Sequence, residues 1–285
     1  MATLVVGAGG TPQGIFPHMK HIAAILGVSD HFMYFGFDVD QDIENNQDLL
    51  PEERFRLQMA DREDLRQHAQ ALHLSLELLE YVHERGTRGV RAVGAFFAAF
   101  NGQELDHQLR MRLNLLMARG EREKQHTVVL LFSTEGGTGS SLGIYTLALL
   151  RQVAERERKR FQVHLVPVCP LIYNPYDDPT LVARRQASAH CTLEELFLLQ
   201  EPGPALMLSD RFVPRRRDLC WLVEPDLPDS RLEQDRFFPL LARFIVEITE
   251  GPTAALLLSR LSNIEVVETP HTPSRTGAAY ADPRI

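Results

Sequence analysis

Residues 133–141 could bind an anion, because their types and spacing suit a phosphate group. They read Ser-Thr-Glu-Gly-Gly-Thr-Gly-Ser-Ser and directly follow an apolar run at residues 127–132. Glycine lets a backbone bend sharply and approach a ligand closely, since no Cβ intervenes. The stretch opens an apolar helix expected over residues 142–153, and the N–H groups and dipole at a helix N-terminus favour an anion. The sequence therefore predicts a nucleotide-binding turn.

A second glycine-rich stretch lies at residues 7–14 and follows a short apolar strand expected at residues 4–6. It departs from the dinucleotide-binding pattern G-x-G-x-x-G and lacks the Lys-Ser/Thr pair of a P-loop. Dinucleotide binding remains open, with Asp38 or Asp40 as the acid that binds the ribose. Both acids, however, lie further from the glycines than the roughly 20 residues which that function expects.

A sheet must position both stretches. The hydrophobic patterns predict further strands at residues 31–37, 89–95, 161–168 and 205–208, and helices at 15–26, 64–85, 102–119, 181–199 and 231–249. Alternating strands and helices predict an α/β fold, with a Rossmann-like, mostly parallel sheet and helices on both faces. Ligands bind such sheets at the carboxyl ends of the strands, so the two glycine turns are expected to converge there.

The composition excludes several classes of function. The chain has 285 residues, 44% of them hydrophobic, and a net charge of −8, which favours a large α/β domain and argues against a nucleic-acid partner. Its three cysteines form no CxxC pair and its histidines form no HExxH pattern, so no metal site built from protein side chains is expected. We expect no signal peptide, no transmembrane segment and a cytoplasmic location.

The run at residues 135–140 resembles the G-G-G-T-G-[ST]-G signature of the tubulin/FtsZ family of GTPases, and other stretches follow the family's order over residues 3–268. The resemblance implies a tubulin/FtsZ-type nucleotide domain that binds GTP or GDP with Mg²⁺. It also implies that residues 100–104 form a loop near the γ-phosphate. The nucleotide-binding residues that it implies are Gly7, Gly9, Gly10, Thr11, Gln13, Asp38, Asp40, Glu135, Gly136, Gly137, Thr138, Gly139, Ser140, Tyr173, Asn174, Arg184, Ser209, Asp210 and Phe238.

The chain departs from the family pattern at three positions. Glu135 replaces the first glycine of the signature, where its carboxylate could face away, hold Mg²⁺ through water or weaken binding. Ser141 replaces the last glycine. Ser209 replaces the asparagine of the turn that reads guanine, which leaves guanine specificity open, with Asp210 or Asp235 as alternative acceptors for the base.

Catalysis in this family is completed by an N-x-D-x-x-[DE] loop that reaches the nucleotide of the neighbouring subunit. Asn263, Glu265 and Glu268 have this spacing, with glutamate in place of aspartate. The resemblance implies that their acidic groups polarise the attacking water. The alternative is an ordinary edge strand at residues 264–267 that carries solvated acids.

The resemblance also suggests a domain organisation. We expect a nucleotide-binding domain at residues 1–230, a core helix and following loop at 231–268, and a disordered tail at 269–285. Because the sequence ends soon after the acidic motif, we expect no counterpart of the family's second domain, and this favours a homo-oligomer or a protein partner over a long filament.

Three functions remain open from the sequence. The first is a guanine-nucleotide-binding protein whose GTPase activity depends on self-association or a partner. The second is a pseudo-GTPase that serves as a structural or adaptor subunit. The third is a nicotinamide-dependent oxidoreductase, which rests on residues 7–14 alone and leaves residues 133–141 unexplained.

Overall fold

The computed structural model describes most of the chain, and the fold below refers to that part. The described residues are 2–58, 62–71, 75, 77, 87, 90–119, 126–157, 161–169, 179–201, 206–208, 211–213, 218–224, 226–227, 230–231 and 234–251. Within them, every helix is too short or too polar to cross a membrane. The three cysteines are free thiols.

A six-stranded parallel sheet forms the centre of the molecule, in the order β3-β2-β1-β4-β5-β8. Its strands are β1 (Thr3–Ala8), β2 (Phe32–Asp38), β3 (Arg54–Arg56), β4 (His126–Ser133), β5 (Phe161–Val168) and β8 (Leu219–Cys220). The strand β1 pairs with β2 on one side and β4 on the other, so both glycine-rich stretches follow adjacent central strands. The expected α/β fold with a parallel sheet is confirmed.

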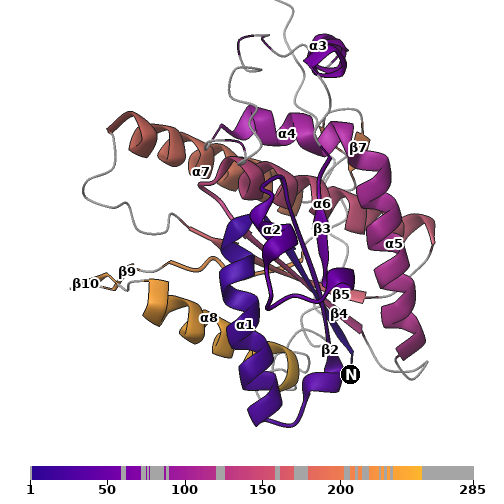
Figure 1. Ribbon diagram of the computed structural model, residues 1–285, viewed down its shortest axis with the longest axis vertical. Coiled ribbons are helices and arrows are strands. Elements are labelled where there is room, and N and C mark those ends of the chain that lie inside the picture. Colours follow the sequence, from indigo (N-terminus) through magenta and orange to yellow (C-terminus); the bar gives the residue numbers. More distant parts are fainter. Residues whose placement is uncertain are drawn as a thin grey trace, which may run out of the picture.

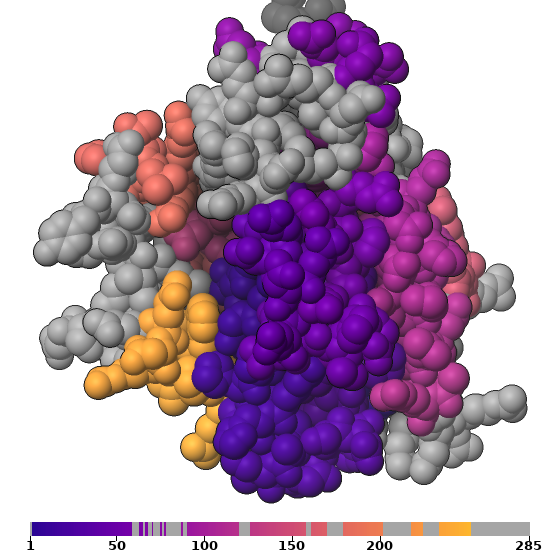
Figure 2. Space-filling model, in the orientation of Figure 1, coloured from indigo at the N-terminus to yellow at the C-terminus, as the bar shows by residue number. Residues whose placement is uncertain are grey.

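Helices cover both faces of this sheet, as Figure 1 shows. The helices are α1 (Gly10–Ile25), α2 (Asp42–Asn45), α3 (Arg62–Ala71), α4 (Arg91–Phe100), α5 (Gly102–Arg119), α6 (Gly137–Arg156), α7 (Pro179–Gln200) and α8 (Gln234–Glu250). Two of them, α1 and α8, lie side by side on one face, and the orange surface of α8 meets the indigo surface of α1 in Figure 2. The other face carries α4, α5, α6 and α7.

Alternation along the central strands explains this layering. In β4, Leu130 faces the core shared with α4 to α7, whereas Val129 and Leu131 face the core shared with α1 and α8. Successive side chains of a strand point to opposite faces, so a strand buried on both sides has apolar residues throughout. The continuous apolar run at residues 127–132 is therefore what a central parallel strand requires.

Three expectations about elements are wrong. Within the segment expected as a strand at residues 89–95, residues 91–95 are instead the start of α4. The helix expected at 64–85 is not continuous, because α3 ends at Ala71 and Ser75 is not helical. Residues 100–104 are not a loop, since Phe100 ends α4 and Gly102 begins α5.

The strand expected near residues 205–208 does form, but outside the main sheet. Here β6 (Leu206–Leu208) pairs antiparallel with β7 (Arg211–Val213), and β9 (Asp226–Leu227) pairs antiparallel with β10 (Ser230–Arg231). The sixth position of the main sheet belongs to β8, which pairs with β5 through Leu219 and Cys220. The edge of the sheet is thus completed by a later segment than the hydrophobic pattern indicates.

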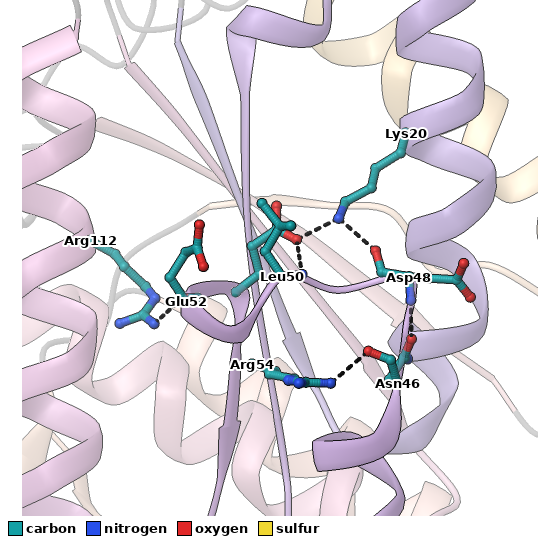
Figure 3. A network of polar contacts seen from close by, with 8 residues as sticks. Lys20, Asn46, Asp48, Leu50, Glu52, Arg54 and Arg112 are labelled. Atoms are coloured by element: carbon teal, nitrogen blue, oxygen red, sulfur yellow. Dashed lines mark hydrogen bonds and ion pairs between the residues drawn. The ribbon is translucent and has the colours of Figure 1, made fainter.

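Cationic side chains fasten the segment that leads from β2 to β3, and Figure 3 shows these contacts. From α1, Lys20 Nζ donates to the carbonyl of Asp48 (2.7 Å) and to the carboxylate of Glu53. From α5, Arg112 donates to the carbonyl of Glu52. Its guanidinium carbon also lies 3.8 Å from the centre of the Phe35 ring. The segment is thus held from both faces of the sheet, which fixes the short, charged edge strand β3 beside β2.

Candidate functional site

The first glycine turn joins β1 to α1 and is shorter than the sequence indicates. The helix α1 begins at Gly10, so residues 10–14 form its first turns instead of a loop. Gly9 carries the turn, with φ of 87° and ψ of −175°, a conformation that L side chains rarely adopt. Its N–H donates to the carbonyl of Phe37 at 2.9 Å. The turn therefore aims the N-terminus of α1 at the carboxyl edge of the sheet.

The second turn joins β4 to α6, which begins at Gly137. Thr134 is bonded to the end of the neighbouring strand β5, because its N–H donates to the carbonyl of Val168 at 2.9 Å. Gly136 has an ordinary extended backbone, with φ of −74° and ψ of 151°, and a Cβ added there would meet nothing within 4 Å. Gly136 thus stands beside open space at the start of a helix. Helix N-termini supply unpaired N–H groups that suit an anion.

The two turns touch each other. A Cβ on Gly9 would lie 3.0 Å from the backbone nitrogen of Gly139. A Cβ on Gly139 would in turn lie 3.0 Å from the carbonyl oxygen of Ser133 and 3.1 Å from that of Ala8. Only glycine permits this approach, so the N-termini of α1 and α6 lie together at the ends of β1 and β4. The expected convergence of the two glycine turns is what the structure shows.

The carboxylate of Asp38 lies beside both turns. It is buried at the end of β2, where it accepts hydrogen bonds from Gln13 Nε2 (3.1 Å) and the N–H of Val39 (2.7 Å). The hydroxyl of Thr138, at the start of α6, also acts on this carboxylate and lowers its pKa. Burial raises the pKa of Asp38 to about 6, against the lowering effect of the backbone N–H groups of Asp40 and Val39. Asp38 is therefore an acid that titrates near neutral pH.

Two residues outside the glycine stretches hold the second turn against α4, and neither was expected from the sequence. The hydroxyl of Thr87 lies 3.4 Å from that of Thr138, and a Cβ on Gly137 would come within 2.0 Å of it. A Cβ on Gly94 would lie 2.1 Å from the carbonyl of Gly137 and equally close to the hydroxyl of Ser141. Gly94 gave the one signal in the sequence, since this segment was expected as a strand and an isolated glycine in a strand pattern suggests close backbone approach.

Another support comes from α7. The fully buried hydroxyl of Thr192 lies within hydrogen-bonding distance of the carbonyl oxygens of Ser188 (2.6 Å), Thr134 (3.3 Å) and Ser140 (3.5 Å). A side chain of α7 thus reaches both ends of the second turn. Nothing in the residue type or spacing of Thr192 distinguishes it from any other threonine in an amphipathic helix.

The remaining expected residues divide into those near the turns, one on a helix surface, and those outside the described part. Phe238 of α8 packs against the first helix, because a Cβ on Gly14 would lie 2.7 Å from its ring. Arg184 lies in α7 with an exposed side chain. Asn101, in the segment expected near the γ-phosphate, donates its amide to the carbonyls of Gln58 and Phe97. Outside the described residues lie Tyr173, Asn174, Ser209, Asp210, Asn263, Glu265 and Glu268.

The comparison with protein families gives one decisive match. The model of a family described as tubulin-like matches residues 4–219, which is most of the chain and includes both glycine turns. The chain belongs to the tubulin-like family. A comparison with curated proteins found no match.

Solved structures show the same fold at low sequence identity. CetZ from Methanosaeta thermophila superposes with a TM-score of 0.56 and is 13% identical in sequence, over 92% of this chain. CetZ2 from Haloferax volcanii, in a GTPγS-bound protofilament, superposes with a TM-score of 0.54 and is 15% identical, over 88% of this chain. TubZ of Clostridium botulinum phage c-st superposes with a TM-score of 0.51 and is 10% identical, over 87% of this chain. The match covers only 58%, 59% and 60% of those chains, respectively. The tubulin/FtsZ-like fold of this member of the tubulin-like family is thus established.

Proposed function

We propose that the chain binds a guanine nucleotide, with its phosphates held by the two glycine turns at the carboxyl edge of the sheet. The observation that carries this proposal is the contact of Gly9 with Gly139, which sets two helix N-termini side by side. Both N-termini then offer backbone N–H groups to one polyphosphate. Membership of the tubulin-like family supports guanine as the base, and two relatives of this fold were solved as GTPγS-bound and GDP-bound forms.

Magnesium fits this site as a companion of the phosphates. Among the described residues, no three His, Cys, Asp or Glu side chains are grouped so that they could hold a metal ion. Mg²⁺ commonly keeps several waters and binds through substrate phosphates, so the chain needs no dedicated metal cage. When bound, the ion would neutralise phosphate charge, while the backbone N–H groups of the turns would orient the phosphates.

A pair of variants at Gly136 tests nucleotide binding without disturbing the fold. We expect Gly136→Asp to weaken the binding of a fluorescent GTP analogue at least tenfold, because it places a carboxylate where we propose a phosphate. The position has room for a side chain, and aspartate favours the start of a helix, so the fold should persist. Gly136→Ala is the matched control and should bind within about threefold of the original chain.

Competition with unlabelled nucleotides completes this test. GTP and GDP should displace the fluorescent analogue, whereas ATP and NAD should not. Equal displacement by ATP would contradict guanine specificity, and displacement by NAD would revive the dinucleotide alternative. Equal binding by Gly136→Asp and Gly136→Ala would show that the second turn does not hold the phosphates.

We further propose that the chain hydrolyses GTP on self-association, through Asn263, Glu265 and Glu268 acting on the nucleotide of a neighbouring copy. The support is the motif spacing and the protofilament of CetZ2, a protein of the same fold. GTPase activity per molecule should then rise with protein concentration, and Glu265→Ala should lower it at least tenfold. A rate per molecule that does not change with concentration would count against this proposal.

The cytoplasmic location and the domain boundaries at residues 230 and 268 stay predictions from the sequence.

A second candidate function is that of a nucleotide-free adaptor subunit. Glu135 favours it, because its buried carboxylate replaces a glycine of the phosphate signature. A like charge at this position would oppose a phosphate. Extraction of the purified protein and identification of any bound nucleotide separates the two candidates: guanine nucleotide at close to one per chain supports the first, and a nucleotide-free chain that copurifies with another protein supports the adaptor.

A further inference from the structure

The carboxylate of Asp38 lies beside the two glycine turns, where the proposed polyphosphate would bring further negative charge. A Cβ on Gly10, the first residue of α1, would lie 3.6 Å from Asp38 Oδ2. The same oxygen accepts from Gln13, also in the first turns of α1, and Thr138 approaches from the start of α6. The Asp38 carboxylate therefore lies next to the same two helix N-termini at which we propose that a polyphosphate binds.

The described groups around the Asp38 carboxylate do not neutralise its charge. The partners from α1 and α6, Gln13 and Thr138, are uncharged. Asp40, two residues along the chain, adds a second negative charge that acts on Asp38. On the adjacent edge strand, Arg56 pairs in register with Asp38, but its guanidinium is bonded to Glu44 at 2.9 Å. Among these groups, none provides a cation to the Asp38 carboxylate.

We propose that Asp38 takes up a proton from solvent when a metal-free polyphosphate binds at the two turns, so that the site disfavours such a ligand at neutral pH. This inference rests on the proposed nucleotide site. Its physical basis is that two anions close together and shielded from water cannot both stay ionised without a large cost. Asp38 is thereby a specificity residue: it selects ligands whose charge is already reduced by a cation or by protons.

The test compares affinities for GDP in the presence of a chelator at pH 5.5 and pH 7.5. If only the protonated form of Asp38 admits the ligand, a pKa of about 6 makes binding about tenfold or more stronger at pH 5.5 than at pH 7.5. Asp38→Asn mimics the protonated form and should remove the part of that change that Asp38 causes, leaving the part that comes from titration of the terminal phosphate of GDP, which also has a pKa of about 6. Asp42→Asn, at an exposed neighbouring site, removes the same charge and should keep the pH dependence of the original chain.

Calorimetry of the unmodified protein gives a second readout that does not depend on a variant. At pH 7.5, the enthalpy of GDP binding in buffers of different ionisation enthalpy should report uptake of close to one proton. Parallel pH dependence in the original chain and Asp38→Asn, or no proton uptake, overturns this inference while leaving the nucleotide site intact. Failure of all variants to bind GDP at either pH overturns the nucleotide site and this inference together.

Discussion

The two glycine turns reach the same edge of the sheet by different physical means. The first is set by its own backbone, since Gly9 adopts a conformation that is nearly closed to other residues. The second has ordinary backbone angles at Gly136, but it is held by contacts with Thr87, which precedes α4, with Gly94 of α4 and with Thr192 of α7. A local turn of this kind can be recognised from its glycine. A turn that is shaped by contacts with other elements can be recognised only once the whole fold is known.

The largest effect should come from the far end of α6, which anchors the second turn at a distance. The side chains of Arg151 and Asp218 are both 1% exposed and joined at 2.7 Å, and Arg151 also donates to the carbonyl of Leu199. Arg151→Met leaves a buried carboxylate without its cation, and we expect a loss of about 4 kcal/mol in the free energy of unfolding. Chemical denaturation measures it. Arg243→Met, from an exposed pair with Glu247, should cost less than about 1 kcal/mol.

The next effect concerns the contact between α4 and the second turn. Gly94→Ala forces a methyl group against the carbonyl of Gly137, so we expect a loss of about 3 kcal/mol in stability and weaker nucleotide binding. Without that contact, alanine would instead stabilise α4 by up to about 1 kcal/mol. A thermal or chemical unfolding curve at least as stable as the original would show that α4 does not press on the turn.

A smaller effect is expected at the first turn, where the backbone conformation matters. Gly9→Ala should lower stability by about 2 kcal/mol, because alanine is strained at a φ of 87° with a ψ of −175°. The adjacent Gly10→Ala is the matched comparison, since its added Cβ would make an ordinary contact at 3.6 Å with Asp38. Equal unfolding free energies for the two variants would contradict the distinction drawn between the turns.

The smallest effect is a dependence of stability on pH that originates at Asp38, between the two turns. Its pKa is raised in the folded state to about 6, so the folded chain holds the proton more tightly than the unfolded chain. The resulting stabilisation is present at low pH and is lost as pH rises through 6. Between pH 5 and pH 7.5 the original chain should lose about 1.5 kcal/mol relative to Asp38→Asn. Denaturation at both pH values, with Asp42→Asn as the control, measures this difference.

Much of the fold could be predicted from the sequence because buried parallel strands are continuously apolar. The strands β1, β2, β4 and β5 and the position of both turns follow from that pattern. The edge strand β3 could not be predicted, since Arg-Phe-Arg has no such pattern and its pairing depends on β2. Residues 89–95 gave the wrong element because so short an apolar window fits a strand or a helix equally well, and packing of Val93 and Phe97 decided for α4.

The candidate site was only partly predictable, for a related reason. Glycines in the two turns, and Asp38 at the end of β2, carry a signal in their type and position. Thr87 and Thr192 carry none, because each threonine becomes important only through its contact with the second turn or the start of α6, which the fold brings beside it. Residues that act by tertiary contact need the three-dimensional arrangement to be recognised.

The burial of α6 has a consequence for the entropy of binding. Every residue from 137 to 154 is buried, the first turn is wedged against α4, and Arg151 fastens the last turns to α7 and to Asp218. The backbone amides at the start of this helix are therefore already held in one orientation, and binding of a ligand would restrict them little further. Ordering of a binding loop ordinarily opposes association. If a phosphate binds at this helix as we propose, its hydrogen-bond donors would already be in place, and little of the binding energy would be lost in ordering them.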